Sequence, residues 1–180
     1  MTDWGLDGWA VRPGDGQIID MGGPHRPEVL VQGSDVDHAM GVFVFTHGVI
    51  PQNPPHAHLD FMKIAYILEG EYDFRVGEGE FSVGPGAVVV VPKGSFHTFT
   101  TATGGRMLFA CSPSGNEELF VEMGRLGPAA TAEQLSKLND RFNTVSLPSD
   151  EGSPWRRMFA EESRQNIGES DYEHGQRSDP

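Results

Sequence analysis

Two histidines stand one residue apart in the stretch "NPPHAHLDFMKIAYILEGEY", which covers residues 53–72. Alternate side chains of a strand point to the same face of a sheet, so His56 and His58 are expected to project together. A third histidine, His97, begins the run "HTFTT" after a Pro-x-Gly turn. Three imidazoles that meet inside a small barrel can hold a transition metal and leave positions open for a substrate. The histidines therefore predict a site for Fe, Mn, Ni, Cu or Zn.

The elements that must position these histidines are short apolar runs between residues 28 and 112. Eight such runs, rich in Val, Phe, Tyr and Thr and separated by Gly, Pro or Asn, are typical of strands. Because no helical period occurs among them, they predict an all-β domain, an antiparallel sandwich or barrel. The later runs "GNEELFVEMGRLG" and "TAEQLSKLNDRF" carry apolar residues at three- and four-residue spacing, and Thr131 with Gln134 resembles a capping box. Two short helices should therefore close the domain.

The composition divides the 180-residue chain into one domain with an arm and a tail. Residues 1–27, rich in Gly, Asp and Pro with two tryptophans, are expected to form an N-terminal arm. Residues 28–148 should form the barrel with its closing helices. Residues 149–180 are acidic and almost without aliphatic side chains, so we expect them to be disordered.

The charge excludes some classes of partner. Lys and Arg number 13 against 26 Asp and Glu, which gives a net charge of -13 and disfavours nucleic acid and anionic membrane surfaces. The single cysteine, Cys111, allows no intrachain disulfide and should be a small buried strand residue. No leader and no apolar run long enough to span a membrane is evident, so a cytoplasmic location is expected.

The histidine pair lies in a motif that resembles the first motif of the cupin superfamily, G(x)5HxH(x)3,4E(x)6G. His56, His58 and Gly70 match this motif, and its first glycine is shifted to Gly48. Lys63 stands where the family has its glutamate.

The second cupin motif, G(x)5PxG(x)2H(x)3N, is matched by Gly86, Pro92, Gly94 and His97, with Thr101 in place of the usual Asn. The likeness covers about residues 10–145 and is that of a single-domain bacterial cupin similar to the quercetin-dioxygenase-like proteins. It implies a jelly-roll barrel, also called a small double-stranded β-helix. It further implies a metal held by the three histidines together with a carboxylate that this chain lacks, and a homodimer formed through edge strands.

Lys63 is the difference from the cupin motifs that most affects the chemistry of the site. Two like unit charges about 4 Å apart repel by roughly 4 kcal/mol at an effective dielectric of about 20, and a divalent ion doubles this. Three hypotheses follow. Lys63 could turn away to a carboxylate such as Asp60 and leave a three-histidine site. It could stay in the pocket, without a metal or deprotonated beside one, as an acid, a base or an anchor for an anionic substrate. Finally, the pocket could be chemically silent.

The pocket around Lys63 is expected to be apolar. Ala65 and Ile67 share a strand face with Lys63, and the small Ala65 leaves room for a ligand. The remaining wall should come from Phe43, Phe45, His47, Phe74, Val90, Phe99, Thr101, Met107 and Phe109. These residues are also ordinary core candidates, but as a lining they suit a hydrophobic or aromatic small molecule.

These observations support one leading function and two alternatives. The leading hypothesis is an oxidoreductase, a metal-dependent dioxygenase of the quercetinase-like type, in which Lys63 positions a substrate oxyanion. The first alternative is a lyase, isomerase or cyclase that needs no O2 and uses Lys63 as acid or base. The second is a non-catalytic cupin that binds a ligand.

Overall fold

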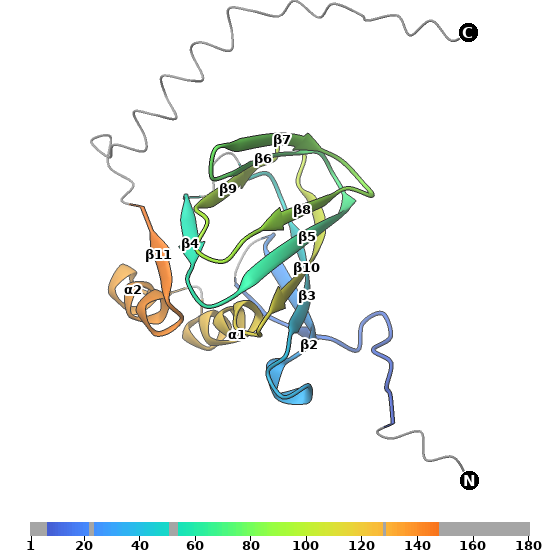
Figure 1. Cartoon of the computed structure of the whole chain (residues 1–180). Helices are drawn as coiled ribbons and strands as arrows, with labels where there is room; N and C mark the ends of the chain where they lie inside the picture. Colours follow the sequence, from blue (N-terminus) through green and yellow to red (C-terminus); the bar gives the residue numbers. More distant parts are fainter. Residues whose placement is uncertain (1–6, 22–23, 51–53, 128, 148–180) are drawn as a thin grey trace, which may run out of the picture. The chain divides into compact units, whose positions relative to one another are not determined.

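The computed structural model describes residues 7–21, 24–50, 54–127 and 129–147. Within these residues the chain forms two antiparallel β-sheets that face each other, and two short helices (Figure 1). The first sheet has the order β1 (Gln17–Ile18), β2 (Arg26–Val31), β3 (Gly41–His47), β10 (Gly105–Ser112), β5 (Met62–Glu69), β8 (Val88–Val91). The second has the order β11 (Thr144–Ser146), β4 (His56–His58), β9 (His97–Thr100), β6 (Tyr72–Val76), β7 (Gly79–Val83). The expected all-β barrel is confirmed.

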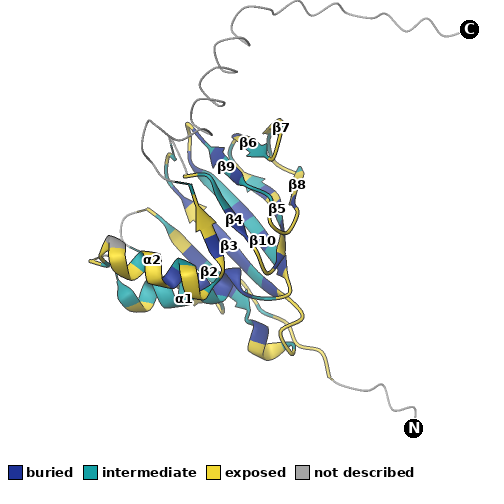
Figure 2. Cartoon of the chain, turned by 60° about the vertical axis from the view of Figure 1, so that its left-hand side comes forward, coloured by how far each residue is buried: buried dark blue, intermediate teal, exposed yellow. Residues whose placement is uncertain are grey.

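The core lies between the inner faces of the two sheets, where buried positions alternate with more exposed ones along each strand (Figure 2). On β5, for example, Lys63, Ala65 and Ile67 are buried, whereas Met62 and Tyr66 are exposed. This alternation follows from the two-residue period of a strand with one face on the core.

The two helices also agree with the expectation. α1 (Asn116–Leu126) packs Phe120 against Phe43 and Phe45, with ring centroids 5.1 and 5.9 Å apart. α2 (Ala132–Arg141) begins with the capping box of Thr131 and Gln134. The chain then enters β11, which pairs with β4 and so reaches the histidine strand. Neither helix of the described residues has the length and apolar character needed to cross a membrane.

A buried carboxylate ties the start of α1 to the first sheet. Glu117 is fully buried and accepts hydrogen bonds from the backbone N–H of Gly33, which opens the 3-10 helix η1 (Gly33–Asp35), and of Gly115, both at 3.1 Å. Cys111 of β10 also donates its thiol to Glu117 at 3.1 Å. Burial and the neighbouring Glu117 raise the pKa of the Cys111 thiol to about 12. Cys111 is therefore a buried thiol, and it lies within hydrogen-bonding distance of this carboxylate.

The first sheet begins inside the segment, residues 1–27, that was expected to form an N-terminal arm. β1 pairs with β2, Ile19 belongs to the core, and Pro27 is fully buried. Residues 17–19 and 26–27 are therefore part of the sheet or packed on it. The tail expected at 149–180 lies outside the described residues.

Candidate metal centre

The structure brings His56, His58 and His97 together, with one ring nitrogen from each within 4.8 Å of the others. His56 and His97 are direct cross-strand partners on β4 and β9. Their ring centroids lie 4.3 Å apart, and the His58 ring lies 5.0 Å from His56 and 5.4 Å from His97. His58 and His97 are buried and His56 is half-buried. The pairing of β4 with β9 thus joins the two motifs in one cluster.

Hydrogen bonds on the outer side of each ring fix which nitrogen carries the proton. Nδ1 of His56 donates to the carbonyl oxygen of Pro54 at 2.9 Å, and Nδ1 of His97 donates to that of Ser95 at 3.1 Å. A carbonyl oxygen can only accept, so Nε2 of both rings keeps a free lone pair.

The third ring is oriented by a side chain from the end of the described chain. Nδ1 of His58 lies 3.0 Å from Oγ1 of Thr144 on β11. The Thr144 hydroxyl donates to the carbonyl oxygen of Phe142 at 3.3 Å, so its oxygen accepts from His58. An imidazole whose outer nitrogen is held in this way is the usual arrangement of a metal ligand.

The cluster also passes a test of whether its donors fit a metal. Nε2 of His97 is buried and has no hydrogen-bond partner among the described residues. A buried, unpaired nitrogen is costly unless something binds it. Three neutral imidazole nitrogens suit Zn, Cu, Fe or Ni, so the residues present fit a divalent transition metal.

The surroundings keep these imidazoles neutral. Burial, with the nearby Lys63 as second cause, lowers the pKa of His56 to about 4 and that of His58 to about 2. The same two causes lower the pKa of His97. At neutral pH the lone pairs are therefore available without the loss of a proton.

Lys63 points at this cluster. Its side chain is 7% exposed, its Nζ lies 3.4 Å from Nε2 of His58, and it lies 5.2 Å from the centre of the Phe109 ring. Burial lowers the pKa of Lys63 to about 7, against a smaller raising effect of Cys111, its cross-strand partner on β10. An amine thus stands where the family has a carboxylate.

The hypothesis that Lys63 turns away to Asp60 is wrong. The Asp60 carboxylate instead accepts from Nδ2 of Asn143, at 3.2 and 3.0 Å. Asn143 adopts a positive φ of 46° just after α2, which places its amide beside Asp60. Lys63 is left inside the barrel beside His58.

The expected wall residues lie inside the barrel, at different depths from the histidines. In the first sheet, cross-strand register places Phe43, Ala65 and Phe109 in the row after Lys63, and Phe45, Ile67 and Met107 in the row after that. In the second sheet, Phe74 and Phe99 form the row after His97, and Thr101 lies two residues beyond Phe99. All of these side chains are buried. Strand parity identified the inner face, but it does not say how far along the barrel a residue lies.

Two of the expected wall residues do not face the histidines. Val90 is 50% exposed, because Val89 and Val91 point inward and Val90 points outward, so its assignment to the wall is wrong. His47 is buried at the far end of its strand, with Nδ1 bonded to the Gly48 carbonyl oxygen at 2.8 Å and Nε2 bonded to the Tyr72 hydroxyl at 3.0 Å. Both ring nitrogens of His47 are therefore engaged away from the cluster.

Two neighbours of the cluster carried no signal in the sequence. Phe61 stacks on His58 with centroids 4.5 Å apart, and Thr144 holds its Nδ1. Phe61 stands at a position of the first motif that requires no particular residue, and Thr144 lies 86 residues beyond His58. Only the paired strands show that they meet.

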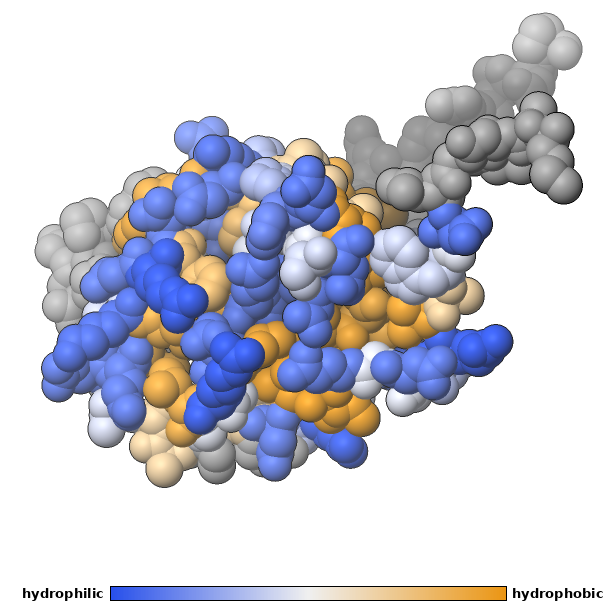
Figure 3. All heavy atoms as spheres, turned by 90° about the horizontal axis from the view of Figure 1, so that it is seen from below, coloured by the Kyte–Doolittle hydropathy of each residue, from blue (hydrophilic) through white to orange (hydrophobic). Residues whose placement is uncertain are grey.

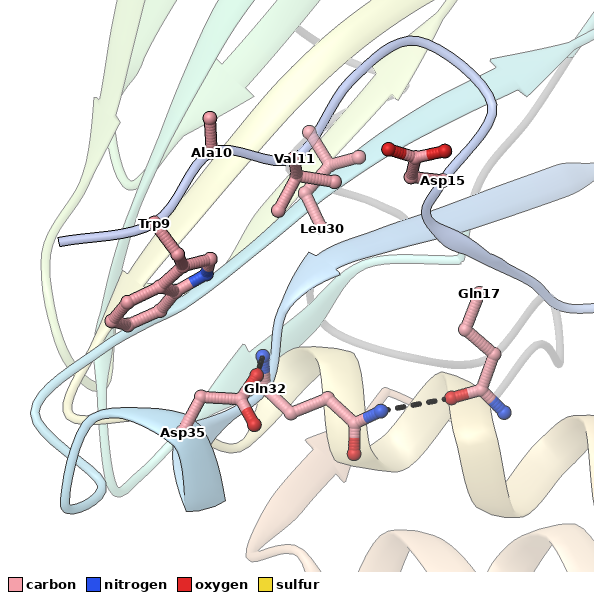
Figure 4. A pocket seen from close by; sticks show the side chains of 8 residues that line it. All are labelled: Trp9, Ala10, Val11, Asp15, Gln17, Leu30, Gln32 and Asp35. Atoms are coloured by element: carbon pink, nitrogen blue, oxygen red, sulfur yellow. Dashed lines mark hydrogen bonds between the residues drawn. The ribbon is translucent and has the colours of Figure 1, made fainter.

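A separate open groove of about 500 Å³ lies on the other side of the first sheet, between the N-terminal residues and β2 (Figure 4). It is lined by Trp9, Ala10, Val11, Asp15, Gln17, Leu30, Gln32 and Asp35. Gln32 donates to Gln17 at 3.0 Å, and the carboxylates of Asp15 and Asp35 accept backbone N–H groups. The groove holds none of the expected site residues.

Comparison with known proteins identifies the class. Residues 44–112 match the family described as the cupin domain. Together with the barrel and its three histidines, this match identifies the fold as that of a cupin. No curated protein sequence matches the chain.

Solved structures share this fold. An RmlC-like cupin from Shewanella frigidimarina NCIMB 400 is 20% identical, with a TM-score of 0.53 over 63% of this chain and 96% of that one. KdgF from Halomonas sp. is 13% identical, with a TM-score of 0.54 over 62% and 99%. Streptomyces Pac13, solved with uridine, is 12% identical, with a TM-score of 0.52 over 83% and 99%. At these identities the likeness establishes the fold alone.

Proposed function

We propose that this cupin is a metal-dependent enzyme that acts on a small molecule, with His56, His58 and His97 as the metal ligands. The observation that carries the proposal is the orientation of the three rings. Each Nδ1 is bonded to an acceptor, which leaves each Nε2 available, and one ring nitrogen from each histidine lies within 4.8 Å of the others. A divalent Fe, Mn, Ni, Cu or Zn ion bound there would supply Lewis-acid or redox chemistry.

For the reaction, we propose a dioxygenase of the quercetinase-like type acting on a hydrophobic or aromatic substrate. The support is the apolar and aromatic environment of the cluster, with Phe61 against His58 and Phe109 under Lys63. In this role the ammonium group of Lys63 binds and orients an anionic oxygen of the substrate. The aromatic rings exclude water from the reacting groups.

A second candidate reaction has its own observation in favour. Because the pKa of Lys63 is lowered to about 7, its amine can both donate and accept a proton near neutral pH. This property suits a lyase, isomerase or cyclase that needs no O2. A non-catalytic cupin would use the same side chains only to bind a ligand.

Metal analysis tests the proposed site. Protein purified without a histidine tag, stripped with a chelator and reconstituted with each of the five metals should bind one ion per chain with at least one of them. His97→Gln should lose this binding, whereas His38→Gln, a change at an exposed histidine, should keep it. Substoichiometric binding with all five metals would overturn the proposal.

Substitution of Lys63 separates the candidate reactions. Oxygen uptake is measured with a panel of aromatic substrates that includes quercetin, and turnover is measured in parallel without O2. If Lys63 only positions the substrate, Lys63→Met raises KM and retains kcat; if it is the acid or base, kcat is lost. Lys63→Glu should strengthen metal binding, and unchanged affinity would show that Lys63 does not face the metal.

We also propose that the protein is a cytoplasmic homodimer. The single buried cysteine, which suits a reducing compartment, supports the location. Gel filtration with light scattering tests the dimer, and fractionation of the source cells tests the location.

A further inference from the structure

His58 differs from the other two proposed ligands in how its ring is held. Nδ1 of His56 and Nδ1 of His97 each donate to a carbonyl oxygen two residues earlier in the chain. The ring of His58 is instead held by two side chains, Thr144 at its Nδ1 edge and Phe61 at its face. The orientation of His58 therefore depends on parts of the fold outside its own strand.

Phe61 covers one face of the His58 ring. The two ring centroids lie 4.5 Å apart, the ring planes differ by 25°, and Phe61 is only 3% exposed. The hydrogen bond from Nδ1 to Thr144 fixes one edge of the imidazole but still allows the ring to tilt about that bond. A second ring stacked on the face opposes such a tilt, so the two contacts together set the direction of Nε2.

The direction of Nε2 matters because a second group competes for its lone pair. Nζ of Lys63 lies 3.4 Å from this nitrogen. A tilt of the imidazole toward Lys63 would engage the lone pair in that hydrogen bond and turn it away from His56 and His97. Since a ligand must be held within roughly 0.5 Å of its productive position, a small movement of the His58 ring is enough to weaken the site.

Phe61 is itself held by the first residues of α1. This helix lies below the barrel in Figure 1, and the surface seen from below shows apolar side chains gathered between hydrophilic ones (Figure 3). The residues at the start of the helix, Gly115, Asn116 and Glu117, are by contrast buried. Gly115 is the N-cap, and a methyl group added to its Cα would lie 3.0 and 3.1 Å from two ring carbons of Phe61. The backbone and the ring are thus in contact with no room for a side chain between them.

The buried Glu117 carboxylate keeps Gly115 in this place. It accepts the backbone N–H of Gly115 and that of Gly33, both at 3.1 Å, and so ties the start of α1 to the residues that follow β2. Gly115 has a φ of 152°, which residues with a Cβ atom rarely adopt. Each contact from Glu117 through Gly115 and Phe61 to His58 is therefore defined by its geometry.

We propose that Phe61 and Gly115 are positioning residues for the metal centre, which hold the His58 ring so that its Nε2 points at the ion rather than at Lys63. The inference rests on the proposed function, because it takes His58 to be a metal ligand. It extends that function by giving the start of α1, which lies beyond both histidine motifs, a part in metal binding.

Calorimetric titration of the full chain with divalent Zn, Fe, Mn, Ni and Cu measures this effect. Phe61→Leu and Gly115→Ala should each raise the Kd for the ion about 10- to 100-fold, the usual loss when an outer partner of a ligating histidine is removed. Phe81→Leu is the control for the first, since Phe81 is 47% exposed on β7. Gly127→Ala is the control for the second. Gly127 ends α1 with a φ of 74°, and an added methyl group there would meet no atom of the described residues within 4 Å beyond its chain neighbours. Both controls should keep the Kd of the wild type.

Proton NMR of the metal-free protein adds a readout that a general loss of stability does not move. The ring current of Phe61 shifts the Cε1–H resonance of His58, so Phe61→Leu and Gly115→Ala should move this resonance much more than that of His97. Gly115→Ala and Gly127→Ala should both lower Tm, because both place a side chain at a positive φ. Only Gly115→Ala should also raise the Kd and move the His58 resonance.

An unchanged Kd in Phe61→Leu and Gly115→Ala overturns the proposal, and so does an equal rise of the Kd in the two control variants. If Gly115→Ala does not fold, as judged by circular dichroism, Phe61→Leu decides alone. A wild type that binds none of the five metals refutes the proposed function instead. In that case the His58 resonance of the metal-free variants still decides whether Phe61 and Gly115 hold the ring, and a resonance that does not move overturns the inference.

Discussion

Replacing Lys63 with methionine should stabilise the metal-free protein. The side chain is buried inside the barrel without a carboxylate among the contacts described for it, and its Nζ lies against the neutral Nε2 of His58. Methionine has a similar length and no charge. Lys63→Met should therefore keep the packing and remove the cost of burying an ammonium group.

The lowered pKa of Lys63 determines how much stability Lys63→Met should gain and how this gain depends on pH. The pKa of Lys63 falls from 10.5 to about 7 on folding, chiefly because of burial. Each pKa unit corresponds to about 1.4 kcal/mol, so burial of the charged form costs about 5 kcal/mol. Loss of the contact with His58 offsets about 1 kcal/mol, which leaves an expected gain of about 3–4 kcal/mol at pH 7.

The direction of the pH dependence of stability follows from proton binding to Lys63. Between pH 7 and 10.5 the unfolded chain holds the Lys63 proton more tightly than the native protein does, so native stability rises with pH. The cost is fully present below pH 7 and has fallen to roughly 1 kcal/mol at pH 10. The advantage of Lys63→Met should therefore be largest at pH 7 and small at pH 10.

Urea unfolding of chelator-treated protein, followed by far-ultraviolet circular dichroism, measures this difference. Dichroism is preferred to tryptophan fluorescence because Trp9 is 60% exposed and reports little of the core. Lys93→Met, at an exposed position, is the control and should change the free energy of unfolding by less than about 0.5 kcal/mol. A Lys63→Met variant less stable than wild type at pH 7, or a difference constant from pH 7 to 10, would refute the reasoning.

Three further predictions concern the site and the fold. Thr144→Val removes the acceptor of His58 Nδ1 and should weaken metal binding about 10- to 100-fold in calorimetry, whereas Thr144→Ser should bind as the wild type does. Equal affinities of wild type and Thr144→Val would mean that the hydroxyl does not orient the ring. Metal affinity should fall about tenfold per pH unit below pH 7, because protonated Lys63 repels the ion. In Lys63→Met the affinity should stay constant down to about pH 5. The same pH dependence in wild type and Lys63→Met would contradict a pKa of Lys63 near 7. Glu117→Ala should lower the free energy of unfolding by about 2–4 kcal/mol, because it removes the buried hydrogen bonds to Gly33 and Gly115. Glu133→Ala, at an exposed position, is the control and should change it little. Equal losses in the two variants would show that the hydrogen bonds of Glu117 contribute nothing.

The histidine cluster could be predicted from the sequence because its information is local. Two residues of one strand share a face by parity, and a Pro-x-Gly turn leads directly into His97. Lys63 was placed on the correct face for the same reason, since parity along β5 depends only on its neighbours.

The errors arise where a local pattern is ambiguous or the partner is distant. The run of four valines in β8 has no polar residue to mark its outer side, so the outward position of Val90 could not be deduced. Asp60 is close to Lys63 in sequence, but its carboxylate accepts hydrogen bonds from Asn143, which lies 83 residues further along the chain. Thr144 could not be found at all, because nothing near it in sequence indicates that β11 pairs with β4.

The hydrogen bond between His58 and Thr144 has a consequence for the order in which the protein is made. The two residues are 86 positions apart, so all three histidines leave the ribosome well before the residue that orients one of them. A nascent chain that ends between His97 and β11 already carries all three proposed metal ligands, but His58 still lacks its partner. Tight loading of the proposed ion should therefore wait until β11 has left the ribosome and paired with β4.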